Sequence, residues 1–93
     1  MSTKKLKVGI PVIYYREGRY FVAHCPFLEL VSQGRTYEEA GKRFEELVKI
    51  FFEELKEKGT TGEVLTDLGW EKSNGSWSPP IFVGEERKEV IIP

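Results

Sequence analysis

The chain has 93 residues, of which 40% are hydrophobic and 31% charged, and this balance is typical of one folded domain rather than a disordered chain. Its formal net charge is −1, so it lacks the basic excess that supplies most of the affinity of a stand-alone nucleic-acid-binding domain. The composition therefore argues against a dedicated DNA- or RNA-binding protein.

Cysteine usage and hydropathy indicate the compartment. Cys25 is the only cysteine, which argues against a disulfide framework and against a cysteine metal cluster. No apolar run is long enough to cross a bilayer, and the first residues lack the apolar stretch of a signal peptide. We therefore expect a cytoplasmic protein with no membrane partner. A single asparagine and a single glutamine, beside abundant Glu and Lys, also resemble the composition of thermophile proteins.

The first part of the chain predicts an antiparallel hairpin and a third strand. Residues 7–15 are rich in β-branched and aromatic side chains, which favours a strand. Glu17-Gly18 can supply the positive φ of a tight turn. Residues 19–25 then form the return strand, which Pro26 ends because it has no N–H to donate. A short loop leads to the third predicted strand at residues 30–32.

A long helix is the clearest predicted element. Thr36 and Glu39 have the spacing of a capping box, in which the hydroxyl accepts the Glu39 amide and the carboxylate reaches back to the Thr36 amide. Apolar residues then recur at three- and four-residue steps and predict an amphipathic helix that ends near Lys58, with Gly59 as its C-cap. The apolar stripe consists of Tyr37, Ala40, Phe44, Leu47, Val48, Phe51 and Leu55.

A second, shorter helix and a hairpin are predicted after this long helix. Thr60 and Glu63 repeat the capping-box spacing and begin a helix of one or two turns, which Gly69 stops. Asn74-Gly75 is a strong signal for a two-residue hairpin turn.

The end of the chain is predicted to be ordered. Residues 81–83 and 90–92 are short, β-branched runs and therefore candidate strands. Trp70 and Trp77 are expected to pack against the core. We accordingly interpret the whole chain as a single domain in which residues 70–93 form a C-terminal hairpin and strand extension.

These elements predict an α+β fold: an antiparallel β-sheet with one long helix packed on one face, in the order β-β-β-α, followed by a short second helix and C-terminal strands. Apolar residues lie on both predicted faces of the first hairpin, whereas a sheet with one solvated face alternates apolar and polar residues. One helix covers one face, so the second face needs the C-terminal tail or another subunit. We favour another subunit, and we expect self-association as a dimer or larger oligomer.

One apolar residue lies outside the stripe of the long helix. Ile50 is surrounded on the helix by Arg43, Glu46, Glu53 and Glu57. A lone exposed isoleucine is ordinary; the alternative is that Ile50 marks a contact surface. The candidate interaction surface combines these helix positions with two aromatic residues of the sheet. It consists of Tyr15, Phe21, Arg43, Glu46, Ile50 and Glu53.

Catalytic chemistry is not indicated. His24 is the only histidine, and its neighbour Cys25 points to the opposite face of the same strand, so a Cys-His dyad is disfavoured. A metal-dependent nuclease needs converging carboxylates, but the first hairpin carries only Glu17, and Asp67 is the only aspartate. We therefore predict no catalytic residue, no metal site and no cofactor, and we expect the protein not to be an enzyme.

Four aromatic residues of the first hairpin could form a stacking platform for RNA. They are Tyr14, Tyr15, Tyr20 and Phe21. Such a platform needs a positive groove, and only Arg16 and Arg19 lie nearby in the sequence. Packing in a core or an interface is favoured over RNA binding, which stays open as an alternative.

The stretch from Gly18 to about Leu55 resembles the HicB-like antitoxin domain. The family pattern is a strand that ends in Cys-Pro or a similar pair, a short loop with a leucine, a Gln-Gly-x-Thr turn, and a helix that opens with Glu-Glu-Ala. Several separated landmarks match this pattern in order and spacing. They are Cys25-Pro26, Leu28, Gln33-Gly34, Thr36 and Glu38-Glu39-Ala40.

The resemblance implies a role. HicB-like proteins are type II antitoxins that bind and neutralise a small HicA-like toxin, a protein of double-stranded-RNA-binding fold that cleaves mRNA. Their N-terminal domain resembles a reduced ribonuclease-H-like fold without the catalytic acids. Many members also carry a C-terminal helical segment that binds operator DNA. After Gly69 this chain has hairpin and proline signals instead, which argues against DNA binding and against autoregulation. The alternatives are an orphan oligomeric domain and an RNA-binding module, each without a toxin partner. A hydrolase or nuclease that uses His24 with glutamates ranks last.

Overall fold

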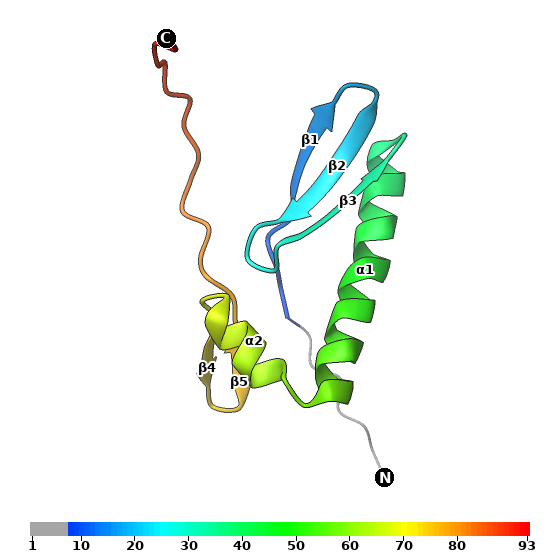
Figure 1. Cartoon of the computed structure of the whole chain (residues 1–93), viewed down its shortest axis with the longest axis vertical. Coiled ribbons are helices and arrows are strands. Elements are labelled where there is room, and N and C mark those ends of the chain that lie inside the picture. The colour runs from blue at the N-terminus through cyan, green and yellow to red at the C-terminus, as the bar shows by residue number, and fades with distance from the viewer. Residues whose placement is uncertain (1–7) are drawn as a thin grey trace.

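The fold is α+β, as predicted (Figure 1). A computed structural model describes residues 8–93, in which a three-stranded antiparallel sheet precedes a long helix, a short helix and a small hairpin. The elements are β1 (Ile13–Glu17), β2 (Tyr20–Cys25), β3 (Leu30–Gly34), α1 (Tyr37–Lys58), α2 (Thr61–Asp67), β4 (Glu71–Ser73) and β5 (Ser76–Ser78). Neither helix of the described residues is long and apolar enough to span a membrane.

The first strand is shorter than predicted. It begins at Ile13, whereas the prediction placed it at residues 7–15, of which residue 7 lies outside the described part of the chain. The turn at Gly18, which has φ +63°, fixes a register that pairs Ile13 with His24. Residues before position 12 would therefore lie opposite Pro26 and beyond, where β2 has already ended. The apolar pattern of this segment instead reflects packing, because Ile10 and Val12 lie against the core.

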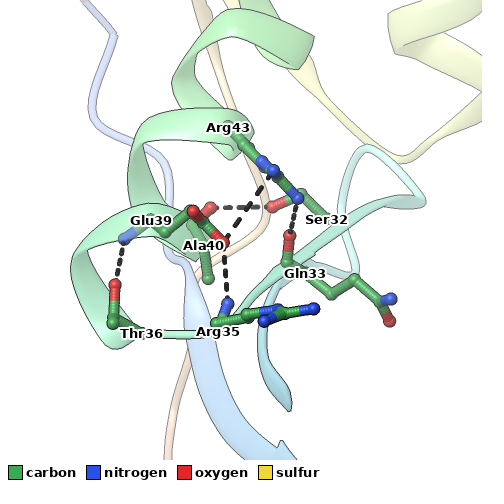
Figure 2. A network of polar contacts seen from close by, with 7 residues as sticks. All are labelled: Ser32, Gln33, Arg35, Thr36, Glu39, Ala40 and Arg43. Carbon is green, nitrogen blue, oxygen red and sulfur yellow. Dashed lines mark hydrogen bonds and ion pairs between the residues drawn. The ribbon is translucent and has the colours of Figure 1, made fainter.

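Helix α1 begins and ends where the sequence predicted. The Thr36 hydroxyl accepts the Glu39 amide at 3.0 Å, and Gly59 closes the helix in the left-handed region with φ 68°. The second hydrogen bond of the predicted capping box was assigned to the wrong amide. The Glu39 carboxylate accepts the amide of Arg35 at 2.7 Å rather than that of Thr36 (Figure 2). The cap therefore also ties the end of β3 to the first turn of the helix.

The core lies between the sheet and α1. Ala23 and Cys25 of β2 are fully buried under the helix. Ser32 of β3 donates its hydroxyl to the carbonyl of Ala40 at 2.8 Å, which joins the two elements by a polar contact (Figure 2). The buried cluster consists of Ala23, Cys25, Leu28, Ala40, Phe44, Leu55, Leu65 and Trp70.

The predicted second helix forms, but without its predicted cap. Helix α2 follows Thr60, whose side chain makes no capping hydrogen bond, so the second capping box predicted with Glu63 is wrong. The Asn74-Gly75 hairpin is confirmed, and both residues have the positive φ of the tight turn, 52° and 79°.

Trp70 attaches this C-terminal part to the body. Its side chain is 3% exposed, and its indole N–H donates to the carbonyl of Phe27 at 2.9 Å. Trp77 also packs against the core, so the expectation for both tryptophans is confirmed. The strands predicted at residues 81–83 and 90–92 are absent. Residues 79–93 instead form an extended arm that leaves the hairpin and runs along the long axis of the molecule (Figure 1).

Candidate functional site

The face of the sheet that points away from α1 exposes several apolar side chains around its central residue, Val22, which is itself buried. The cross-strand row Tyr15–Val22–Gln33 and the row Ile13–His24–Val31 both lie on it. Its exposed apolar side chains are Ile13, Tyr15, Tyr20 and Val31, which are 37–53% exposed, and we call this surface the open sheet face. A shallow hollow of about 350 Å³ lies on it between Tyr15, Val22 and Val31.

The outer surface of α1 is the second candidate surface, and it exposes an isoleucine beside several carboxylates. Ile50 is 54% exposed and lies outside the buried stripe of the helix. Residues three, four and seven apart share a helix face. Four glutamates therefore lie beside Ile50, together with Leu47 and Arg43. We call this surface the helix patch; it consists of Glu46, Ile50, Glu53, Glu54 and Glu57. Within residues 8–93, none of these four carboxylates forms an ion pair.

Arg43 lies at the N-terminal end of the helix patch and is held away from it. Its guanidinium donates to the carbonyl of Gln33 at 3.1 Å and lies 3.9 Å from the Glu39 carboxylate (Figure 2). Arg43 is the only cation among the four α1 residues of the predicted interaction surface, and these contacts direct its side chain toward β3. The free surface around Ile50 is consequently acidic.

The six residues of the predicted interaction surface do not form one surface. Arg43, Glu46, Ile50 and Glu53 share the outer face of α1, as predicted from their spacing. Tyr15 lies on the open sheet face. Phe21 pairs with Arg16 on the opposite face and is partly buried against the core, with the Arg16 guanidinium 5.5 Å from its ring centre. Both aromatic residues are therefore separate from the helix patch.

Several exposed residues were missed by the sequence prediction. Tyr20 and Val31 complete the open sheet face, and Glu54 completes the helix patch. Glu57 was placed beside Ile50 by its spacing but was left out of the predicted surface. Glu54 could have been found from its spacing to Ile50. Val31 could not, because its face depends on the pairing of β3 with β2.

The aromatic platform that RNA binding would need is not assembled. Tyr15 and Tyr20 lie on the open sheet face, whereas Tyr14 and Phe21 lie on the face toward α1. Tyr14 is stacked on Tyr37 of the helix, with ring centroids 4.2 Å apart. Burial raises the pKa of the Tyr14 hydroxyl above its usual range, and the nearby Tyr37 and Glu45 raise it further.

The described residues hold no constellation for metal or dyad chemistry. No group of three or more His, Cys, Asp or Glu side chains in residues 8–93 converges as metal ligands would. His24 lies on the open sheet face beside Tyr15, with ring centroids 6.4 Å apart, while Cys25 is buried on the other face. The sequence-based separation of these two residues is confirmed.

An apolar groove lies beside the C-terminal half of α1. Its volume is about 540 Å³. It is lined by Val8, Ile10, Val48, Phe52, Lys56, Thr61, Leu65, Trp70 and Trp77. Besides apolar side chains, the lining offers the Lys56 ammonium, the Thr61 hydroxyl and the Trp77 indole N–H.

Comparisons with protein-family models, with curated proteins and with solved structures gave no match for this chain. A functional conclusion accordingly has to come from the two exposed surfaces.

Proposed function

We propose that this chain is a HicB-like antitoxin that binds a small, mRNA-cleaving HicA-like toxin through the helix patch and blocks its RNA-binding surface. The observation that carries this proposal is the exposed Ile50 beside four carboxylates that have no ion-pair partner in residues 8–93. Lys and Arg contacts to phosphates supply much of the affinity of a nucleic-acid-binding protein, so a cationic surface is expected on an RNA-cleaving toxin. An acidic surface with an apolar centre is its complement.

The arrangement of the helix patch supports protein binding over simple solvation. A contact surface gains most of its energy from a few central side chains that a polar rim shields from water. Ile50 is suited to the central position, and Glu46, Glu53 and Glu54 to the rim. The charges contribute mainly to the rate and specificity of association, because complementary fields steer the encounter.

The landmarks that resemble the HicB-like family also support the proposal through their structural roles. Cys25 and Leu28 are buried in the core beneath α1, and Thr36 caps this helix. Gln33 supplies the carbonyl that holds Arg43 away from the patch. These residues together position the helix that presents Ile50.

Co-expression with a HicA-like toxin tests the proposal, beginning with any small basic protein encoded beside this chain. We expect co-purification, restored growth and loss of mRNA cleavage in vitro. Ile50→Ala should weaken the complex about 10-fold or more, and Glu46→Lys with Glu53→Lys should weaken it further and lower its dependence on salt. Glu71→Lys on β4 is the matched control, since it reverses an exposed charge outside the patch.

Two results would overturn the proposal. The first is a complex that Ile50→Ala and the double charge reversal leave as tight as the Glu71→Lys control does. The second is a folded protein that neither binds the toxin nor protects mRNA. The second result would favour an orphan oligomeric domain.

A further inference from the structure

The arm at residues 79–93 exposes an unusual amount of apolar surface. Val83 is 94% exposed and Ile91 is 99% exposed, and the arm makes no strand pairing within residues 8–93. Its apolar residues form two runs, Ile81–Val83 and Val90–Ile92, separated by a charged segment in which Lys88 pairs with Glu86 at 2.9 Å. β-branched runs of this kind are suited to packing on a sheet rather than to solvent.

The same chain carries an apolar surface that lacks a cover. The open sheet face exposes Ile13, Tyr15, Tyr20 and Val31, and no element of residues 8–93 packs on it. The surface of the whole chain is 8149 Å², whereas a compact monomer of 10.7 kDa exposes about 5,500 Å². The chain thus has both an arm without a partner surface and a surface without a partner segment.

The start of the arm packs against the body. Pro79 and Pro80 restrict the backbone to an extended path. Both prolines are half-buried, and Pro80 lies against the turn after α2, where a Cβ added to Gly69 would be 3.6 Å from its ring. The arm then runs along the long axis of the molecule and makes no strand pairing with its own sheet (Figure 1). Its apolar runs therefore remain available to a second copy of the chain.

We propose that the arm packs on the open sheet face of a second copy of this chain, and that the second copy's arm does the same in return. Such an exchange is isologous and closes as a two-fold dimer. The arm is long enough, because residues 81–92 span about 40 Å when extended, whereas a six-residue strand such as β2 spans about 20 Å. One apolar run can therefore lie along the partner's strands, while the other reaches beyond their end.

The first test measures the mass of the full-length protein in solution by light scattering and sedimentation. We expect a dimer at micromolar concentration. The arm variant Val83→Glu with Ile91→Glu and the face variant Tyr15→Ser with Val31→Lys should each raise the dimer dissociation constant by about 100-fold or more. All four residues are exposed, so unchanged circular dichroism should confirm that the monomers stay folded. Ile50→Ser is the control, as an exposed isoleucine outside both surfaces.

Mixing the arm variant with the face variant provides the decisive test. In the mixture, the intact arm of the face variant can still bind the intact face of the arm variant. We therefore expect a heterodimer from two proteins that are monomeric alone. A monomeric native chain, a dimer that tolerates both pairs of substitutions, or a mixture that stays monomeric would overturn arm exchange. Each result is independent of toxin binding, which depends on the helix patch.

Discussion

Tyr14 and Gly41 share a tight contact at the residue scale. A Cβ added to Gly41 of α1 would lie 2.7 Å from the hydroxyl of Tyr14, whose ring is fixed by its stack on Tyr37. The ring carbons of Tyr14 would be farther away, at 3.6 and 3.7 Å, which is ordinary contact. The Tyr14 hydroxyl alone therefore leaves no room for a side chain at this position of the helix, which explains the glycine.

This contact predicts non-additive effects on stability. Alanine in a helix interior is favoured over glycine by about 1 kcal/mol, but in the native chain the clash with the Tyr14 hydroxyl should offset this gain. In a Tyr14→Phe background, Gly41→Ala should raise the free energy of unfolding by about 1 kcal/mol. Urea denaturation of the four proteins measures the difference. Gly62→Ala in α2, which meets only Trp77 at 3.6 Å, is the control and should act equally in both backgrounds.

The raised pKa of Tyr14 predicts a dependence of stability on alkaline pH. The hydroxyl is neutral in both states below pH 10, the usual pKa of tyrosine. Above that pH the unfolded state loses its proton first, so the folded state loses stability as the pH rises toward the folded pKa. Chemical denaturation between pH 9 and about 11 should show a smaller loss for Tyr14→Phe than for the native chain. An equal loss in both would refute the role of Tyr14. Tyr20→Phe on the open sheet face serves as the control.

Gly34 shows how closely β3 and α1 approach at the scale of elements. The family pattern places this glycine in its Gln-Gly-x-Thr turn. The structure gives a different reason, because Gly34 is the buried last residue of β3, and an added Cβ would lie 2.7 Å from the backbone nitrogen of Ala40. Gly34 is required for space rather than for a change of direction.

Gly34→Ala should therefore destabilise the fold. The clash is with helix backbone, which cannot rotate away, so we expect the free energy of unfolding to fall by about 1–3 kcal/mol. Thermal denaturation followed by circular dichroism measures the loss. Gly9→Ala, where the added methyl group would meet nothing within 4 Å, should leave the midpoint unchanged. Equal effects of the two substitutions would show that the strand and helix can move apart.

The elements that the sequence predicted well are those fixed by local contacts. Both ends of α1 follow from neighbouring residues, since Thr36 caps Glu39 and Gly59 adopts the left-handed conformation. The start of β1 was misplaced because it depends on where β2 ends at Cys25, across the turn. Residues 81–83 have the composition of a strand, but a strand needs a partner, and none lies in residues 8–93.

At the scale of the whole molecule, features that depend on local sequence were again predictable, and features that depend on distant contacts were not. The lack of apolar–polar alternation in the first hairpin correctly indicated apolar side chains on both faces of the sheet. It could not indicate that the second face stays exposed within residues 8–93, because that depends on the path of the arm after Pro80. The helix part of the candidate site was predictable from spacing, whereas Tyr15 and Phe21 were grouped wrongly because the sequence does not give their faces relative to α1.

Trp70 joins the C-terminal part of the molecule to the sheet. Its indole N–H is the donor to the Phe27 carbonyl in the loop between β2 and β3, and its ring lies edge-on to Phe52 of α1, with centroids 6.2 Å apart. One side chain thus connects three segments that are distant in the sequence. Helix α2 and the β4–β5 hairpin depend on this contact for their position.

Trp70→Phe should loosen this part while the rest of the fold persists. The substitution removes the donor and leaves the Phe27 carbonyl without its partner, at a cost of about 1–3 kcal/mol. Hydrogen exchange should increase in α2 and in β4 and β5 more than in the N-terminal half of α1, because local opening of the C-terminal part becomes easier. Trp77→Phe is the control, since the Trp77 indole makes no hydrogen bond within residues 8–93. Uniform faster exchange along the chain after Trp70→Phe would instead show that the whole molecule unfolds as one cooperative unit.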